Sequence, residues 1–205
     1  MKKIFFALII FLMNFSAASA VEIAETNYLG NENLVYPFVI VENHEVEKKI
    51  NAEIFSEVER FLAEVKKNSA EMNATATVTI NFEIPCNYEF GILSVILTEY
   101  VYFEKSAHPA TYRRALNFNS DSGQRIFAKN LIFSYEDDES NYSPKNLTLK
   151  LKKYAKKNNI HLYEDFRELT QIPEDFYFDE NLRVHFIFQQ YEVAPYAAGI
   201  IEIEC

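Results

Sequence analysis

The four histidines of the chain are the first side chains to test for catalytic or metal-binding chemistry. His44, His108, His161 and His185 are scattered, and none belongs to an HExxH motif or pairs with a cysteine or histidine at metal-ligand spacing. The chain also has no CxxC, no GxSxG of serine hydrolases and no glycine-rich phosphate loop. We therefore expect no metal, no cofactor and no catalytic residue.

The 30 acidic residues could supply a pair of catalytic carboxylates by chance. Glu99 and Glu104 lie in one predicted strand, and their odd spacing places them on opposite faces of it. A glycosidase needs two carboxylates that face the same cleft. The sequence therefore favours a protein that is not an enzyme.

Two segments differ from plain scaffold because a proline interrupts an extended run beside a histidine or tyrosine. One is the link KSAHPAT over 105–111, and the other is YEVAPYAAG over 191–199. Loops on a rigid sheet often carry binding groups. The candidate binding residues are His108, Pro109, Tyr191, Glu192, Pro195 and Tyr196. The alternative is that both segments are sheet corners, with tyrosine hydroxyls bonded to the backbone.

The first 20 residues predict export. Lys2 and Lys3 precede an apolar run over 4–15, and Ala18-Ser19-Ala20 supplies the small residues of a cleavage site. The run is shorter than the roughly 20 residues that span a bilayer, which argues against a membrane anchor. We expect cleavage after Ala20, a periplasmic or extracellular protein, and no stable membrane insertion afterwards.

The charge of the mature chain is strongly negative. Loss of Lys2 and Lys3 leaves 18 basic and 30 acidic residues, a net charge of −12. Such a field disfavours nucleic acid and anionic membrane surfaces and speeds encounter with a basic partner. Solubility outside the cell is the simpler explanation of the same charge.

Both cysteines, Cys86 and Cys205, lie in the exported part, where an oxidising compartment permits a disulfide. A bond between them would close a very long loop and contribute on the order of 4–5 kcal/mol in the chain-entropy model. Two thiols, or a dimer linked through Cys205, are the alternatives.

Hydrophobic periodicity predicts one domain over residues 21–205. An apolar stripe at spacings of three and four after Asn43 predicts a helix that ends near Lys67, and Ser143-Pro144 predicts the start of a second. Period-two or apolar runs predict strands over 34–41, 75–84, 92–104, 110–119, 176–178, 182–189 and 200–204, with a helical turn near 164–169 and an acidic loop over 135–142. This is an α+β domain, a mostly antiparallel sheet with helices packed on a face.

The run LTEYVYFEKSAHPATYRRALNFNSDSGQ over 97–124 and VHFIFQQYEVAPYAAGIIEIE over 184–204 also carry a resemblance. They are similar to a bacterial extracytoplasmic family that includes the extracellular domain of the lysozyme-sensing anti-sigma factor RsiV and the accessory domain of the peptidoglycan deacetylase PdaC. The resemblance implies an α+β fold and a binding role at the cell envelope, with a basic protein such as lysozyme, or peptidoglycan, as partner. The alternatives are a peptidoglycan-active hydrolase or deacetylase accessory domain, and a structural envelope protein.

Overall fold

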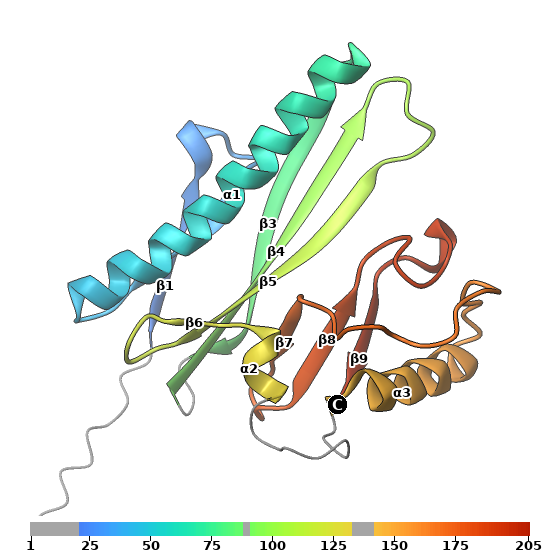
Figure 1. The fold of residues 1–205 in the computed structure, drawn as a ribbon. Helices are drawn as coiled ribbons and strands as arrows, with labels where there is room; N and C mark the ends of the chain where they lie inside the picture. Colours follow the sequence, from blue (N-terminus) through green and yellow to red (C-terminus); the bar gives the residue numbers. More distant parts are fainter. Residues whose placement is uncertain (1–20, 88–90, 133–141) are drawn as a thin grey trace, which may run out of the picture.

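The computed structural model describes residues 21–87, 91–132 and 142–205 (Figure 1). Its elements are β1 (Glu22–Asn27), β2 (Val35–Ile40), α1 (His44–Met72), β3 (Ala76–Asn87), β4 (Ile92–Phe103), β5 (Ala110–Asn119), β6 (Arg125–Ile126), α2 (Ala128–Ile132), α3 (Pro144–Lys157), β7 (Phe176–Phe178), β8 (Val184–Phe188) and β9 (Ile201–Glu204). The predicted signal peptide and nearly all of the predicted acidic loop lie outside the described residues. Within the described ranges, no helix is long and apolar enough to cross a membrane.

Helix α1 begins where the sequence predicts, and it ends five residues beyond the predicted end at Lys67. The Asn43 side chain accepts hydrogen bonds from the N–H groups of Glu45 and Val46, and caps the first turn. The helix ends at Asn73, whose left-handed backbone (φ 47°) is a common way to stop a helix. Its buried stripe consists of Val46, Ile50, Ile54, Val58, Phe61 and Val65.

The central sheet is antiparallel, in the order β3-β4-β5-β6; its first three strands are predicted from the sequence, and the two-residue strand β6 is not. Strand β4 is buried on both faces, as its apolar composition predicts. Leu93, Val95 and Leu97 face the cluster that contains the α1 stripe, and Ile96 faces the other way. Figure 1 shows α1 running along these strands.

Strand β2 is the predicted first strand, and it pairs with β1, a strand that the sequence analysis did not predict. The β1 sequence EIAETN has few apolar side chains, so its own pattern is weak. Asn51 of α1 fixes β2 from the side, because its amide donates to Val39 O at 2.7 Å and accepts from Val39 N at 2.8 Å. Pro37 lies in this two-stranded sheet, as expected for an edge strand.

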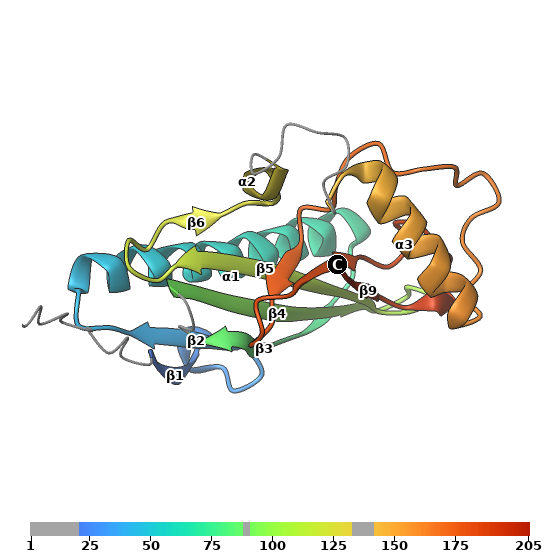
Figure 2. The same ribbon diagram turned by 90° about the horizontal axis from the view of Figure 1, so that it is seen from below.

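The C-terminal part forms a three-stranded sheet, β7-β8-β9, which we call the small sheet, and α3 lies beside it (Figure 2). Ser143 caps α3 through Asn146 N, as predicted. The prediction of a helical turn near 164–169 is wrong. The chain makes a turn at 164–165, and no helix follows it up to residue 169. Phe166 and Leu169 pack against the cluster under the small sheet, and Leu169 N–H bonds to Thr148 Oγ1 at 2.9 Å. These contacts hold the segment against the cluster and against α3.

The small sheet packs on the face of the central sheet opposite α1. Ile96 and Ala115 meet Ile187 there in one cluster. Two buried polar side chains of the central sheet, Ser94 and Asn117, bond to each other at 2.6 Å. They also bind the β7 backbone, through Phe178 N–H to Ser94 Oγ at 3.1 Å and Asn117 Nδ2 to Phe176 O at 2.6 Å. The fold class is therefore confirmed as one α+β domain of mostly antiparallel sheets with packed helices.

Candidate functional site

Three rings from the two predicted binding segments meet at one place, which we call the aromatic cluster: His108, Tyr191 and Tyr196. The His108 ring stacks on the Tyr196 ring with centroids 3.9 Å apart. His108 Nε2 lies 2.8 Å from the Tyr191 hydroxyl oxygen, and the two tyrosine rings are 5.7 Å apart. Figure 1 shows the β4–β5 and β8–β9 connections on the same side of the molecule. Segments 83 residues apart in sequence thus form one surface.

Tyr191 is held in an unusual backbone conformation. Its φ is 66°, in the left-handed region that residues other than glycine rarely adopt. Such a backbone conformation costs on the order of 1–2 kcal/mol. Its side chain is not buried in return, since 52% of the residue is exposed. The fold therefore places the ring of Tyr191 at the surface, on a residue whose backbone conformation is strained.

The other predicted residues support the geometry of this surface. His108 Nδ1 lies 3.0 Å from the carbonyl oxygen of Pro109. Glu192 accepts a hydrogen bond from Gln189 N–H at 2.7 Å, and burial of its carboxylate raises its pKa, with Asp175 adding to the effect. Pro195 precedes the short 3-10 turn Tyr196–Ala198, which ends at Gly199 with a φ of 70°. Glu192 and Pro195 are thus turn-forming residues beside the aromatic cluster.

The β8–β9 connection is anchored to the edge of β5 by side chains that replace a strand. Gln190 Oε1 accepts from Thr111 N–H at 3.0 Å, and Gln189 Oε1 accepts from Arg113 N–H at 3.1 Å. Gln189 Nε2 in turn donates to Arg113 O at 2.8 Å. These bonds satisfy an otherwise open sheet edge and fix the aromatic cluster relative to the central sheet.

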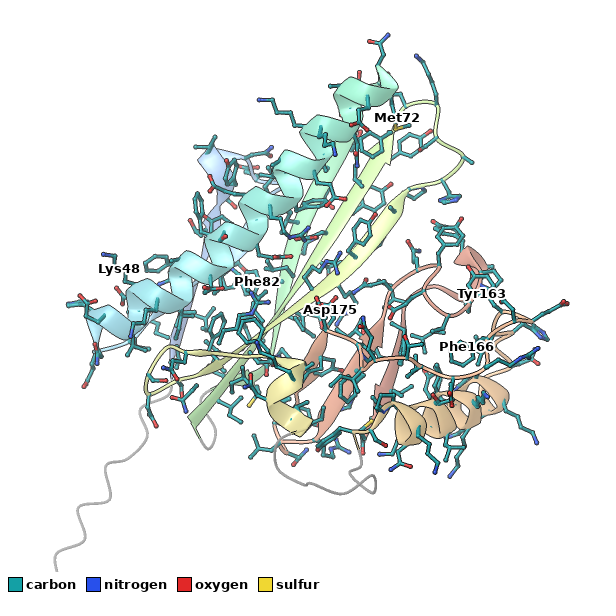
Figure 3. All side chains as sticks on the ribbon, in the orientation of Figure 1. Lys48, Met72, Phe82, Tyr163, Phe166 and Asp175 are labelled. Carbon is teal, nitrogen blue, oxygen red and sulfur yellow. The ribbon has the colours of Figure 1, made fainter. Side chains whose placement is uncertain are left out.

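Asp175 bonds to the next part of the same β5 edge, at Ala115. Its Oδ1 accepts from Ala115 N–H at 3.0 Å, and its Oδ2 accepts from Arg114 Nη1 and from Gln189 Nε2, both at 2.9 Å. Figure 3 shows Asp175 between the central sheet and the small sheet. Asp175 and both glutamines give no signal in the sequence, because each one acts through a partner about 60–80 positions away.

A cavity of about 880 Å³ lies on the α1 side of this edge. Its walls come from α1, from β5 and β6, from α2 and from the segment 170–175. Four cationic side chains line it: Arg60, Arg114, Arg125 and Lys129. A smaller cavity of about 170 Å³ shares Arg114 and Asp175 with it and reaches Gln189 and Glu192.

Glu99 is fully buried on β4, facing α1. Neither carboxyl oxygen has a hydrogen-bond partner among the described residues, and Arg60 Nη2 lies 3.7 Å from Oε2. Burial raises the pKa of Glu99 to about 8, and the neighbouring Glu57 adds to this while Arg60 and Arg114 oppose it. Desolvation thus outweighs the distant guanidinium groups and favours the protonated form of Glu99.

The two cysteines lie in the same part of the molecule. Cys86 is buried in the hydrophobic cluster under the small sheet, and Cys205 packs against that cluster. Both are thiols in this structure, and burial raises the pKa of Cys205. A disulfide between them stays a prediction.

One family model matches part of the chain. Residues 124–204 match the family model described as "Protein of unknown function (DUF3298)". A DUF3298 family member from Bacteroides fragilis NCTC 9343 is similar in structure, with a TM-score of 0.56, 14% identity, and coverage of 91% of this chain and 88% of that one. A DUF3298 family protein from Pseudomonas aeruginosa PAO1 gives a TM-score of 0.57, 14% identity, and coverage of 90% and 88%. No curated protein matches the chain significantly.

The family match includes the small sheet, α3 and two of the three rings of the aromatic cluster, while His108 lies upstream of it. At 14% identity the two solved structures show a shared fold and nothing about a ligand. Residues 124–204 are therefore similar to the DUF3298 family model, and the overall fold of the chain is similar to that of the two DUF3298 structures.

Proposed function

We propose that the protein is an exported, non-enzymatic binding module of the bacterial envelope and that the aromatic cluster is its binding surface. The observation that carries this proposal is the exposed ring of Tyr191, held in a left-handed backbone conformation and oriented by His108. Exposed tyrosines on a fixed scaffold are frequent anchors of protein interfaces, because they bury a large area at little cost in conformational entropy.

The rigidity of the surface supports the same role. His108 stacks on Tyr196, and the neighbouring Gln189 and Gln190 bond to the backbone of β5. A surface that is already ordered before binding loses little entropy on association. This distinguishes the aromatic cluster from loops that fold only around a partner.

The proposed partner is a basic protein such as lysozyme. A net charge of −12 on the mature chain steers cationic proteins toward it and raises the association rate at low salt. The resemblance of the two binding segments to the lysozyme-sensing and wall-associated family points the same way. Peptidoglycan is the other partner that this resemblance implies.

A titration of the protein with lysozyme by calorimetry tests the proposal. We expect measurable binding at low salt that weakens as salt is added, because the steering charges are screened. Peptidoglycan fragments serve as the second titrant, and binding of these alone would move the proposal from a protein partner to a glycan. Absence of binding to both at low salt would contradict a role in recognising either of them.

The alternative, a wall-active hydrolase or deacetylase, draws on one observation. A buried carboxyl group with a raised pKa, 3.7 Å from an arginine that lines a cavity, is a feature that active sites share. Incubation with purified peptidoglycan separates the two functions, because only an enzyme would release soluble fragments or acetate. We expect neither product.

A further inference from the structure

The 880 Å³ cavity is a second candidate site, made of residues that do not belong to the aromatic cluster. Its volume falls within the range of small-molecule sites, roughly 300–1,000 Å³. Its walls come from α1 and the central sheet on one side and from segment 170–175 on the other. Pockets where two packed units meet are a common place for ligands.

The charge of the cavity differs from that of the rest of the protein. Four cationic side chains line it against three acidic ones, Glu57, Glu174 and Asp175, although the whole chain has a net charge of −10. Glu57 bonds to Arg60, and Asp175 bonds to Arg114 at 2.9 Å. These two guanidinium groups are therefore held in place by partners that are themselves part of the wall.

The other two cationic groups are placed around an exposed aromatic ring. The Arg125 guanidinium carbon lies 5.4 Å from the centre of the Phe127 ring, and Lys129 Nζ lies 5.2 Å from it. Phe127 is 47% exposed. Arg125 has a long contact with Glu53 at 3.4 Å, and within the described ranges Lys129 has no ion pair. Two cations and an apolar ring face at the cavity wall are suited to a ligand that combines an anionic group with a ring.

Glu99 does not cancel this positive charge. It is not among the residues that line the cavity, and burial raises its pKa, which favours its neutral form. Arg114 contributes one more feature, because its buried Nε has no hydrogen-bond partner among the residues that the structure describes. An unsatisfied buried N–H group is costly and calls for an acceptor.

Hydrogen-bonding groups complete the wall. Thr170 and Gln171 offer a hydroxyl and an amide, and Glu174 is an acceptor without an ion pair in the described part of the chain. Hydroxyl groups of a ligand can donate to Glu174 and accept from Gln171. The combination of cations, one ring face and several polar groups matches a polyhydroxylated anion better than an apolar one.

We propose that this cavity binds a monosaccharide that carries an anionic group, with the anion at Arg125 and Lys129, the sugar ring against Phe127, and its hydroxyls toward Gln171 and Glu174. The anionic group can be a carboxylate or a phosphate, since lysine and arginine bind both. This proposal does not depend on the function assigned to the aromatic cluster.

Glucuronate, glucose 6-phosphate and glucose are the probes that test it, each titrated into the ¹⁵N-labelled protein and followed by NMR. We expect both anionic sugars to shift the backbone amides of Phe127, Lys129 and Gln171 and to bind at least about tenfold more tightly than glucose, a difference of about 1.4 kcal/mol. The tighter of the two anions assigns the group as carboxylate or phosphate.

The double variant Arg125→Gln/Lys129→Gln should weaken binding of the anionic sugars at least about tenfold and bring it close to that of glucose. Lys153 is exposed on α3 and does not line the cavity. The control variant Lys153→Gln therefore removes one positive charge elsewhere and should leave binding unchanged. Unchanged spectra, equal affinity for glucose and both anions, or binding that the double variant does not weaken would overturn the proposal. The amide spectrum of the double variant also reports whether its fold is intact.

Discussion

Replacing Glu99 by glutamine is expected to make the stability of the protein much less dependent on pH. We expect the free energy of unfolding of the wild type to fall as the pH rises from about 5 to about 8, and the variant should lose most of this fall. The pKa of Glu99 is raised from 4.5 to about 8 in the folded protein, chiefly by burial. In this range the folded protein keeps the proton and the unfolded chain has lost it, so stability falls as pH rises through it. The slope approaches about 1.4 kcal/mol per pH unit, which amounts to roughly 3–4 kcal/mol over the range.

Urea unfolding of the wild type and Glu99→Gln at several pH values measures this difference. Glutamine has nearly the same shape and does not titrate, so the free energy of unfolding of the variant should exceed that of the wild type by more at pH 8 than at pH 5. Glu104→Gln is the matched control, because Glu104 is exposed just beyond the same strand. Parallel pH profiles for wild type and Glu99→Gln would show that the Glu99 carboxyl ionises normally in the folded protein.

Replacing Asp175 by alanine is expected to lower the free energy of unfolding by about 3 kcal/mol. The change removes three hydrogen bonds, from Ala115 N–H, Arg114 Nη1 and Gln189 Nε2. It also leaves the Arg114 guanidinium without its ion-pair partner in a partly buried place, and unpaired polar groups of this kind account for most of the loss.

Two further variants make the Asp175 prediction specific. Asp175→Asn should lose on the order of 2 kcal/mol, because one oxygen can still accept from Ala115 N–H while its amide group meets the donors of Arg114 and Gln189. Glu174→Ala, an exposed neighbour on the same segment, should stay within about 0.5 kcal/mol of the wild type. Equal stability of Asp175→Ala and Glu174→Ala would show that Asp175 does not hold the segment to β5.

The sequence predicts most of the fold because the strong elements carry their own pattern. The alternation over 76–84 and the α1 stripe each need one buried face, and only one secondary structure provides it. Strand β1 has only a weak pattern of its own, because Ile23 is its one large apolar side chain and its ordering also depends on pairing with β2. The turn at 164–165 replaced a predicted helical turn for a similar reason, since tertiary contacts of Phe166 and Leu169 override local propensity.

Some residues of the candidate sites are likewise visible in the sequence, and others are not. The proline-containing segments with His108 and Tyr191 are visible in the sequence, and the structure brings their rings together. The role of Gln189 at the β5 edge and the burial of Glu99 under Arg60 depend on packing between distant elements. No local pattern distinguishes these two side chains from the other polar residues of the chain.

The most direct test of the central claim is a calorimetric titration of Tyr191→Gly with lysozyme, beside the wild type. Glycine tolerates the φ of 66°, so relief of strain should offset the lost hydroxyl bond to His108 and keep the free energy of unfolding within about 1 kcal/mol of the wild type. Asn159→Gly is the matched control, because Asn159 is exposed with a φ of 54° and lies outside the aromatic cluster. We predict that Tyr191→Gly raises Kd at least about tenfold and that Asn159→Gly leaves it unchanged. A Kd for Tyr191→Gly equal to that of the wild type would contradict the claim that the aromatic cluster is the binding surface.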